Sequence, residues 1–226
     1  MYETALRVTV EAVSAFICLI LLWFMVKPYR LTREDRYLGL PLGFGFLGLT
    51  YILGAISFSM PDYFFKGLDW LQLIARTLAF TFLAVTYYFS RKPLRNSRII
   101  WDVTFSLLII IVTSLVAVGI TLTGLNSNTY QTAQVYIRIF NIICLVYISF
   151  HTVRSHLEEP DPSTIWIPFG FIILGVSQFS LLIWAIDRSL SAFWGALVLR
   201  LVALIIFLLV SYNTFYKGAI NENNFP

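Results

Sequence analysis

Charged and redox-active residues are scarce in this sequence. Of its 226 residues 12% are charged, whereas 58% are hydrophobic and 17% aromatic, and there are two cysteines and two histidines. Soluble domains ordinarily contain about 25% charged residues, so this composition excludes the soluble class and favours a membrane protein. Because both cysteines fall within apolar runs, a disulfide framework is excluded as well.

The residue patterns of common enzymes are also missing. There is no serine elbow, no glycine-rich phosphate loop followed by lysine, and no histidine within an apolar run beside a carboxylate. We therefore expect no enzymatic activity. His151 and His156 lie five residues apart, which puts them on different faces of a helix, so we expect no metal site. The net charge of +4 comes from short loops rather than a basic stripe, so we expect no nucleic-acid partner.

Long hydrophobic runs are the dominant positive feature. Runs of about 20 apolar residues are long enough to cross a bilayer, and seven are present: 4–26, 37–58, 68–89, 99–123, 130–150, 164–186 and 192–216. The first run lacks a basic leading segment, so we expect a true span rather than a cleavable leader. The sequence predicts an all-α fold, in which residues 1–226 form a single seven-helix transmembrane domain of a multi-pass cell-membrane protein.

The loop charges predict the orientation of this domain. Four Lys or Arg residues lie in 27–36 and four more in 90–98, whereas the loops on the other side contain far fewer. Cytoplasmic loops carry the excess of Lys and Arg. We therefore expect the N-terminus outside and the C-terminus in the cytoplasm.

This architecture is similar to the seven-span input modules of prokaryotic, especially archaeal, membrane sensor proteins. The likeness lies in short loops, aromatic-rich helices and a last helix that leaves the membrane at Tyr216 and Lys217. Nine residues follow Lys217, so the resemblance implies a sensor that signals through a cytoplasmic or membrane partner. The chain does not resemble a retinal opsin, because its lysines all lie at helix ends: Lys27, Lys66, Lys92 and Lys217.

Three arginines lie deep inside apolar runs. They are Arg76, Arg138 and Arg200, 62 residues apart from 76 to 138 and again from 138 to 200. A charge at the bilayer centre costs about 2.5 to 3.5 kcal/mol on insertion scales, so each arginine needs a partner, water or a ligand. All three are near the ninth residue of a span that runs inward, so we expect them in one layer of the bundle.

Other polar residues are predicted to enter the same layer. These candidate ligand-binding residues are Glu11, Gln72, Gln134, Asn141 and Gln178. Three guanidinium groups against one carboxylate leave an excess positive charge, which an anionic small molecule or a lipid headgroup would relieve. In the competing interpretation the arginines reach toward the outer interface and are each satisfied by Gln72, Gln134, Gln178 or Glu11 within the bundle. In a further alternative Glu11 pairs with Arg7 four residues before it, which leaves the three deep arginines without an acidic partner. The sequence identifies no cofactor.

The second and sixth runs share a pattern of proline, glycine and hydroxyl positions. Pro41, Gly43, Phe44, Leu47, Gly48 and Thr50 match Pro168, Gly170, Phe171, Leu174, Gly175 and Ser177. We therefore predict an internal repeat, with one helix followed by three related hairpins that join spans 2 and 3, 4 and 5, and 6 and 7. Binding sites of repeated membrane proteins commonly lie where the repeats meet.

Three functions fit these features. The first is a receptor-like or sensory membrane protein that binds an anionic or lipophilic small molecule in the arginine layer. The second is a small solute or anion transporter, and the third is a non-catalytic subunit of a larger membrane complex. Below the arginine layer the runs become aliphatic and aromatic, which favours binding over passage.

Overall fold

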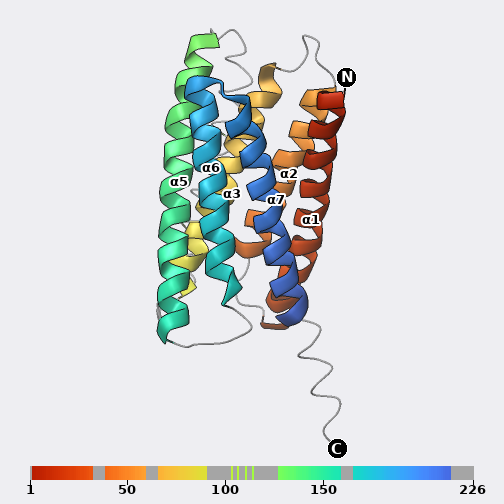
Figure 1. Ribbon diagram of the computed structural model, residues 1–226. Helices are drawn as coiled ribbons and strands as arrows, with labels where there is room; N and C mark the ends of the chain where they lie inside the picture. The colour runs from red at the N-terminus through yellow and green to blue at the C-terminus, as the bar shows by residue number, and fades with distance from the viewer. Residues whose placement is uncertain are drawn as a thin grey trace, which may run out of the picture.

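The described residues form helices, with no strand among them (Figure 1). The computed structural model describes residues 2–32, 39–59, 66–90, 127–158 and 165–214, and the single positions 103, 106, 110 and 114. The long helices within these ranges are α1 (Tyr2–Thr32), α2 (Gly39–Ser59), α3 (Lys66–Ser90), α5 (Ser127–Glu158), α6 (Trp166–Asp187) and α7 (Leu190–Tyr212).

Six helices in these ranges are long and apolar enough to cross a membrane. The chain is therefore a helical, multi-pass membrane protein, as its composition predicts. The fourth predicted span, and with it the predicted middle hairpin, lies outside the described residues except for four positions.

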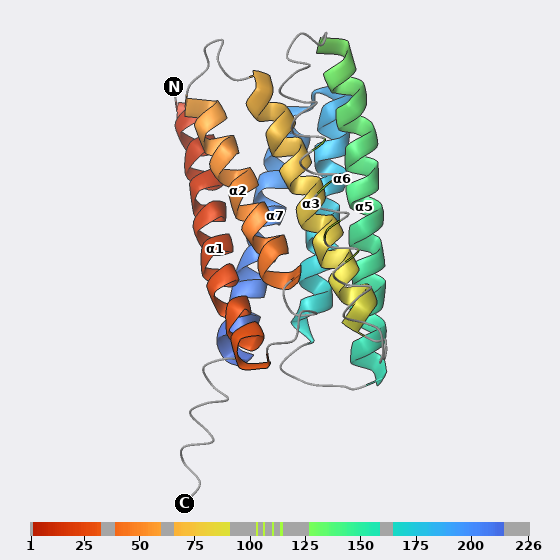
Figure 2. The same cartoon turned by 180° about the vertical axis from the view of Figure 1, so that it is seen from behind.

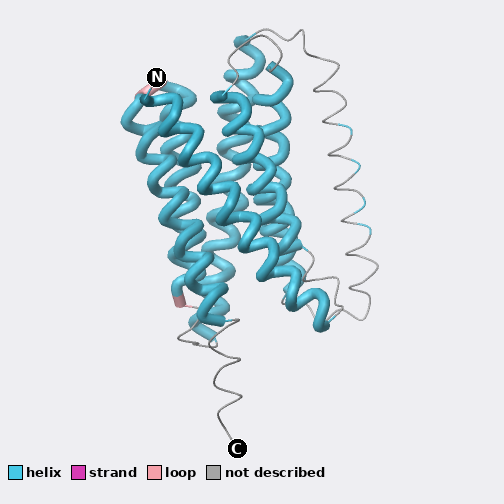
Figure 3. Tube along the Cα trace, turned by 90° about the vertical axis from the view of Figure 1, so that its right-hand side faces the viewer, coloured by secondary structure: helices cyan, strands magenta, loops and turns pink. Residues whose placement is uncertain are grey.

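The described helices are arranged as a closed ring. Around the ring the helices lie in the order α1, α2, α3, α5, α6 and α7, and α7 packs against α1. Figures 1 and 2 show that α1, α3, α5 and α7 run in one direction, whereas α2 and α6 run in the other. Figure 3 shows the same bundle from the side. Residues equally far from the starts of the four co-directed helices therefore lie in one layer.

Two helices continue beyond their apolar runs. α1 ends at Thr32 and α5 at Glu158, six and eight residues past the predicted ends at 26 and 150. In α5 the polar extension carries an exposed pair at i and i+4, in which Arg154 Nε donates to Glu158 Oε1 over 3.0 Å. Such pairs support a solvated helix, so hydropathy alone gives the boundaries of the apolar part only.

Apolar side chains fill the bundle toward the end where α2 and α6 begin. Leucines from four helices are fully buried there: Leu47, Leu83, Leu145 and Leu204. Phe207 packs between Phe171 and Phe44, with ring centroids 4.7 and 5.7 Å away. Pro41 and Pro168 each occupy the first turn of their helix, where the missing N–H is tolerated.

At the opposite end, a two-residue junction joins α6 to α7. Arg188 adopts a left-handed conformation with φ 56°, and its N–H donates to the Trp184 carbonyl over 2.9 Å. This conformation ends a helix sharply and is usually adopted by glycine or asparagine. This short connection places Arg188 beside a cavity at that end of the bundle.

Candidate functional site

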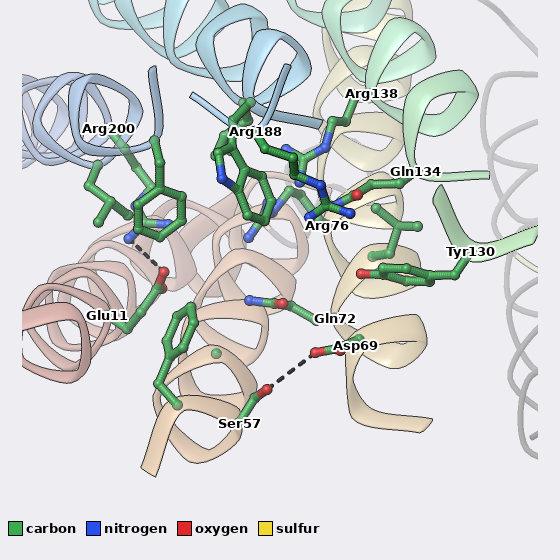
Figure 4. A pocket seen from close by; sticks show the side chains of 17 residues that line it. Glu11, Ser57, Asp69, Gln72, Arg76, Tyr130, Gln134, Arg138, Arg188 and Arg200 are labelled. Carbon is green, nitrogen blue, oxygen red and sulfur yellow. Dashed lines mark hydrogen bonds and ion pairs between the residues drawn. The ribbon is translucent and has the colours of Figure 1, made fainter. Parts of the chain in front are cut away.

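The three deep arginines line one cavity of about 260 Å³, drawn in Figure 4. Arg76, Arg138 and Arg200 come from α3, α5 and α7, and their exposed fractions are only 6%, 4% and 2%. Each lies ten or eleven residues after the start of its helix, which places it about 15 Å along the axis. The three co-directed helices thus bring the arginines into one layer.

Arg200 has an acidic partner within the chain. Its Nη2 lies 3.0 Å from Glu11 Oε1, and both side chains are almost completely buried. Its guanidinium carbon also lies 4.3 Å from the centroid of the Tyr51 ring. Closure of the ring places α7 beside α1, so Glu11 forms an ion pair with Arg200 and does not leave the deep arginines without a carboxylate. The Arg7 guanidinium lies over Phe193, 4.7 Å from the ring centroid.

Arg76 and Arg138 are different, since neither forms an ion pair with a described carboxylate. All three arginines keep buried nitrogens without a hydrogen bond to the described residues: Nε of Arg76, Nε and Nη1 of Arg138, and Nε and Nη2 of Arg200, whose Nη2 is held by the ion pair with Glu11. The guanidinium carbon of Arg138 lies 5.9 Å from the Trp184 ring centroid, and that of Arg188 lies 5.3 Å from the same centroid. Figure 4 shows the Arg76, Arg138 and Arg188 side chains gathered on one side of the cavity, apart from Arg200 and Glu11.

The other predicted residues divide between the cavity and the core. Gln72 and Gln134 line the cavity, and Gln72 Nε2 also donates to the Thr50 carbonyl over 3.3 Å. Asn141 and Gln178 are fully buried but are not among the lining residues. Their amide groups make no hydrogen bonds within the described chain. Helical periodicity thus identified a polar face, but not how deep the cavity extends along it.

Several lining residues were not predicted from the sequence. Polar ones are Ser57, Asp69, Tyr130 and Arg188, and apolar ones are Phe58, Leu73, Leu181, Trp184, Phe193 and Leu197. Ser57 donates to Asp69 Oδ1 over 3.2 Å across α2 and α3. Asp69, Tyr130 and Arg188 lie at helix ends, where polar residues are expected on any membrane protein. Only the three-dimensional arrangement of the helix ends shows that these side chains line one cavity.

The lining has an excess of positive charge. It contains four arginines and two carboxylates, Glu11 and Asp69, and one arginine is already paired with Glu11. Because Arg188 is exposed while it lines the cavity, the space reaches the surface at that end of the bundle. No group of three or more metal-ligating side chains occurs among the described residues.

No protein-family model, curated protein or solved structure matches this chain. Function must therefore be argued from the cavity itself.

Proposed function

We propose that this protein is a receptor-like membrane protein that binds a small anion in the arginine-lined cavity. The observation that carries the proposal is the burial of Arg76 and Arg138 on the cavity wall, with N–H groups that make no hydrogen bond and no ion pair to the described residues. A buried cation without a partner is costly in a layer of low dielectric, whereas a bound anion supplies both charge and hydrogen-bond acceptors. Arginine presents a planar donor fork that suits a carboxylate or a phosphate.

The position of the cavity supports recognition from outside the cell. The basic segments 27–36 and 90–98 include the last residues of α1 and α3 and the residues that follow them, so the positive-inside rule assigns that side to the cytoplasm. The cavity then opens to the exterior. Side chains of α1, α2, α3, α5, α6 and α7 all line the cavity, so a ligand bound there can favour one arrangement of the helices over another. Signalling would pass to a cytoplasmic or membrane partner.

Transport of the anion is the second candidate. It is favoured by the similar packing of the hairpins α2–α3 and α6–α7, because related helix units commonly move against each other in transporters. Passage would require the buried leucines and the phenylalanine cluster around Phe207 to separate. That apolar packing favours the receptor over the transporter.

Thermal unfolding of the detergent-purified protein tests anion binding. We expect acetate, benzoate or phosphate to raise the Tm of the wild type, since a ligand that binds only the folded state stabilises it by about 2.7 kcal/mol at a hundredfold excess over its Kd. Arg138→Gln should remove the shift. The unliganded variant should be no less stable than the wild type, because the change also removes repulsion between buried cations.

Arg154→Gln is the matched control, since it removes the charge of an exposed arginine on the same helix, far along α5 from the cavity. It should keep the full anion response. If no anion shifts the wild-type Tm while Arg138→Gln destabilises the protein, Arg138 has a structural role and the proposal fails.

A further inference from the structure

Two sets of three helices have the same pattern of burial in the same register. Along α1 and α5 the buried positions coincide when residues 127 apart are compared, as in the pairs 11 and 138, 14 and 141, 18 and 145, and 21 and 148. The same offset of 127 relates α2 to α6, as in 44 and 171, 47 and 174, 50 and 177, and 51 and 178. An offset of 124 relates α3 to α7, as in 76 and 200, 79 and 203, 80 and 204, and 83 and 207.

The close approaches between helices follow the same offsets. A Cβ on Gly43 would lie 2.6 Å from Leu83 of α3, and a Cβ on Gly170 would lie 2.6 Å from Phe207 of α7. The neighbours of Gly48 and Gly175 are the β carbons of Cys18 and Leu145, at 3.3 and 3.8 Å.

Hydrogen bonds also join corresponding positions, although the donor helix differs. Gln72 of α3 donates to the Thr50 carbonyl of α2, whereas Ser177 of α6 donates to the Ala196 carbonyl of α7, and positions 50 and 72 correspond to positions 177 and 196. The order of helices around the ring agrees, since α1 against α7 corresponds to α5 against α3. The units are thus α1–α2–α3 and α5–α6–α7, rather than hairpins alone.

This correspondence gives the arginine layer a specific meaning. Arg76 is the counterpart of Arg200, and Arg138 is the counterpart of Glu11. Where α7 meets α1, Arg200 therefore contacts a carboxylate of the chain. At the corresponding place where α3 meets α5, Arg76 faces a second cation, and no described carboxylate forms an ion pair with either arginine.

We infer that the ligand is a carboxylate, whose oxygens take the place between Arg76 and Arg138 that the Glu11 carboxylate takes beside Arg200. The inference rests on the proposed anion binding and names the chemical class of the anion.

The other residues that line the cavity restrict this class further. Phe58, Trp184 and Phe193 offer an apolar wall for the body of the ligand. Asp69, two helical turns from Arg76 on α3, would repel a second negative charge. A small monocarboxylate with an apolar body fits the cavity best.

Restoring the missing carboxylate in the chain tests the correspondence. In Arg138→Glu the new carboxylate should pair with Arg76, so the unliganded variant should melt above both the wild type and Arg138→Gln, and benzoate should no longer raise its Tm. Arg76→Glu is the second variant. Its new carboxylate should pair with Arg138, so this variant should also melt above the wild type and lose the response to benzoate. If both variants melt below Arg138→Gln, or fail to fold while Arg138→Gln folds, the correspondence is wrong.

A ligand series on the wild type tests the class independently. Benzoate and butyrate should raise the Tm at concentrations at least tenfold lower than acetate, and all three should act at lower concentrations than phosphate or succinate. If phosphate acts at the lowest concentration, the carboxylate assignment is wrong, although anion binding itself stands. If no anion acts and both glutamate variants are stabilised, anion binding fails, and the inferred ligand fails with it, while the correspondence of the two units remains.

Discussion

The interface between α1 and α7 and the interface between α3 and α5 bury charge at the same depth in different ways. At the first, Glu11 and Arg200 form an ion pair within the chain. At the second, Arg76 and Arg138 lie on the cavity wall without an ion pair to a described carboxylate. A layer that served only to hold the helices together would be expected to pair the charges at both interfaces alike, because unpaired buried charge is costly. The difference is what supports the proposed anion site at the interface of α3 and α5.

The largest effect is expected where the charges are paired. Glu11→Gln keeps the size of the side chain but leaves Arg200 without its carboxylate, and breaking one partner of a buried pair costs about 3 to 5 kcal/mol. We expect the free energy of unfolding in detergent to fall by that amount, whereas Arg138→Gln at the other interface should cause no loss. Equal losses for the two variants would mean that the interfaces do not differ in the way described.

The next effect concerns the packing that the two units share. A Cβ on Gly43 or Gly170 would press against Leu83 or Phe207, and overpacking of this kind costs about 1 to 3 kcal/mol. Gly170→Ala should cost more than Gly43→Ala, because the Phe207 ring already contacts two other rings and has less room to move.

Gly195→Ala provides the control for these two variants. Apart from its two chain neighbours and the backbone of its own helix, no described atom lies within 4 Å of a Cβ at this position in α7. Since alanine is favoured over glycine inside a helix by about 1 kcal/mol, the protein should be unchanged or slightly more stable. Thermal unfolding of the three variants side by side gives the measurement. If Gly43→Ala and Gly170→Ala behave like Gly195→Ala, the close approaches are not tight, and the shared packing loses its main support.

The membrane-spanning helices and the arginine layer were predictable from the sequence because both give strong, local signals. An apolar run of about 20 residues has few alternatives, and an arginine within one must turn away from lipid. A pair between Glu11 and one of the deep arginines could be proposed from the sequence, but that the partner is Arg200 could not be predicted in the same way. A pair with Arg7 is visible as a spacing of four, whereas a pair with Arg200 depends on α7 closing the ring against α1.

The rim of the cavity shows the same limit. Asp69 and Arg188 lie at helix ends, and nothing in their local sequence distinguishes them from ordinary interfacial residues. They become part of a site only because the start of α3 and the end of α6 both reach the cavity at one end of the bundle. Conversely, Asn141 shares a helical face with Arg138 but lies one turn deeper, beyond the lining of the cavity. Periodicity determines a face, whereas the depth of a cavity depends on how all the helices pack.

The smallest effect distinguishes how the two units hold their hairpins together. Ser177 Oγ donates across helices to the Ala196 carbonyl over 2.8 Å, whereas Thr50 Oγ1 donates to Phe46 within its own helix over 2.9 Å. Hydrogen bonds between membrane helices contribute about 0.6 kcal/mol on average and up to about 1.7 kcal/mol. Ser177→Ala should lower the free energy of unfolding within that range.

Thr50→Val keeps the shape of the side chain and loses only a hydrogen bond within its own helix, to a carbonyl on the same α2 backbone. Its loss should therefore be smaller, and equilibrium unfolding of both variants in the same detergent measures the difference. A larger loss for Thr50→Val would mean that the hydroxyl of the first unit, rather than that of the second, secures the hairpin.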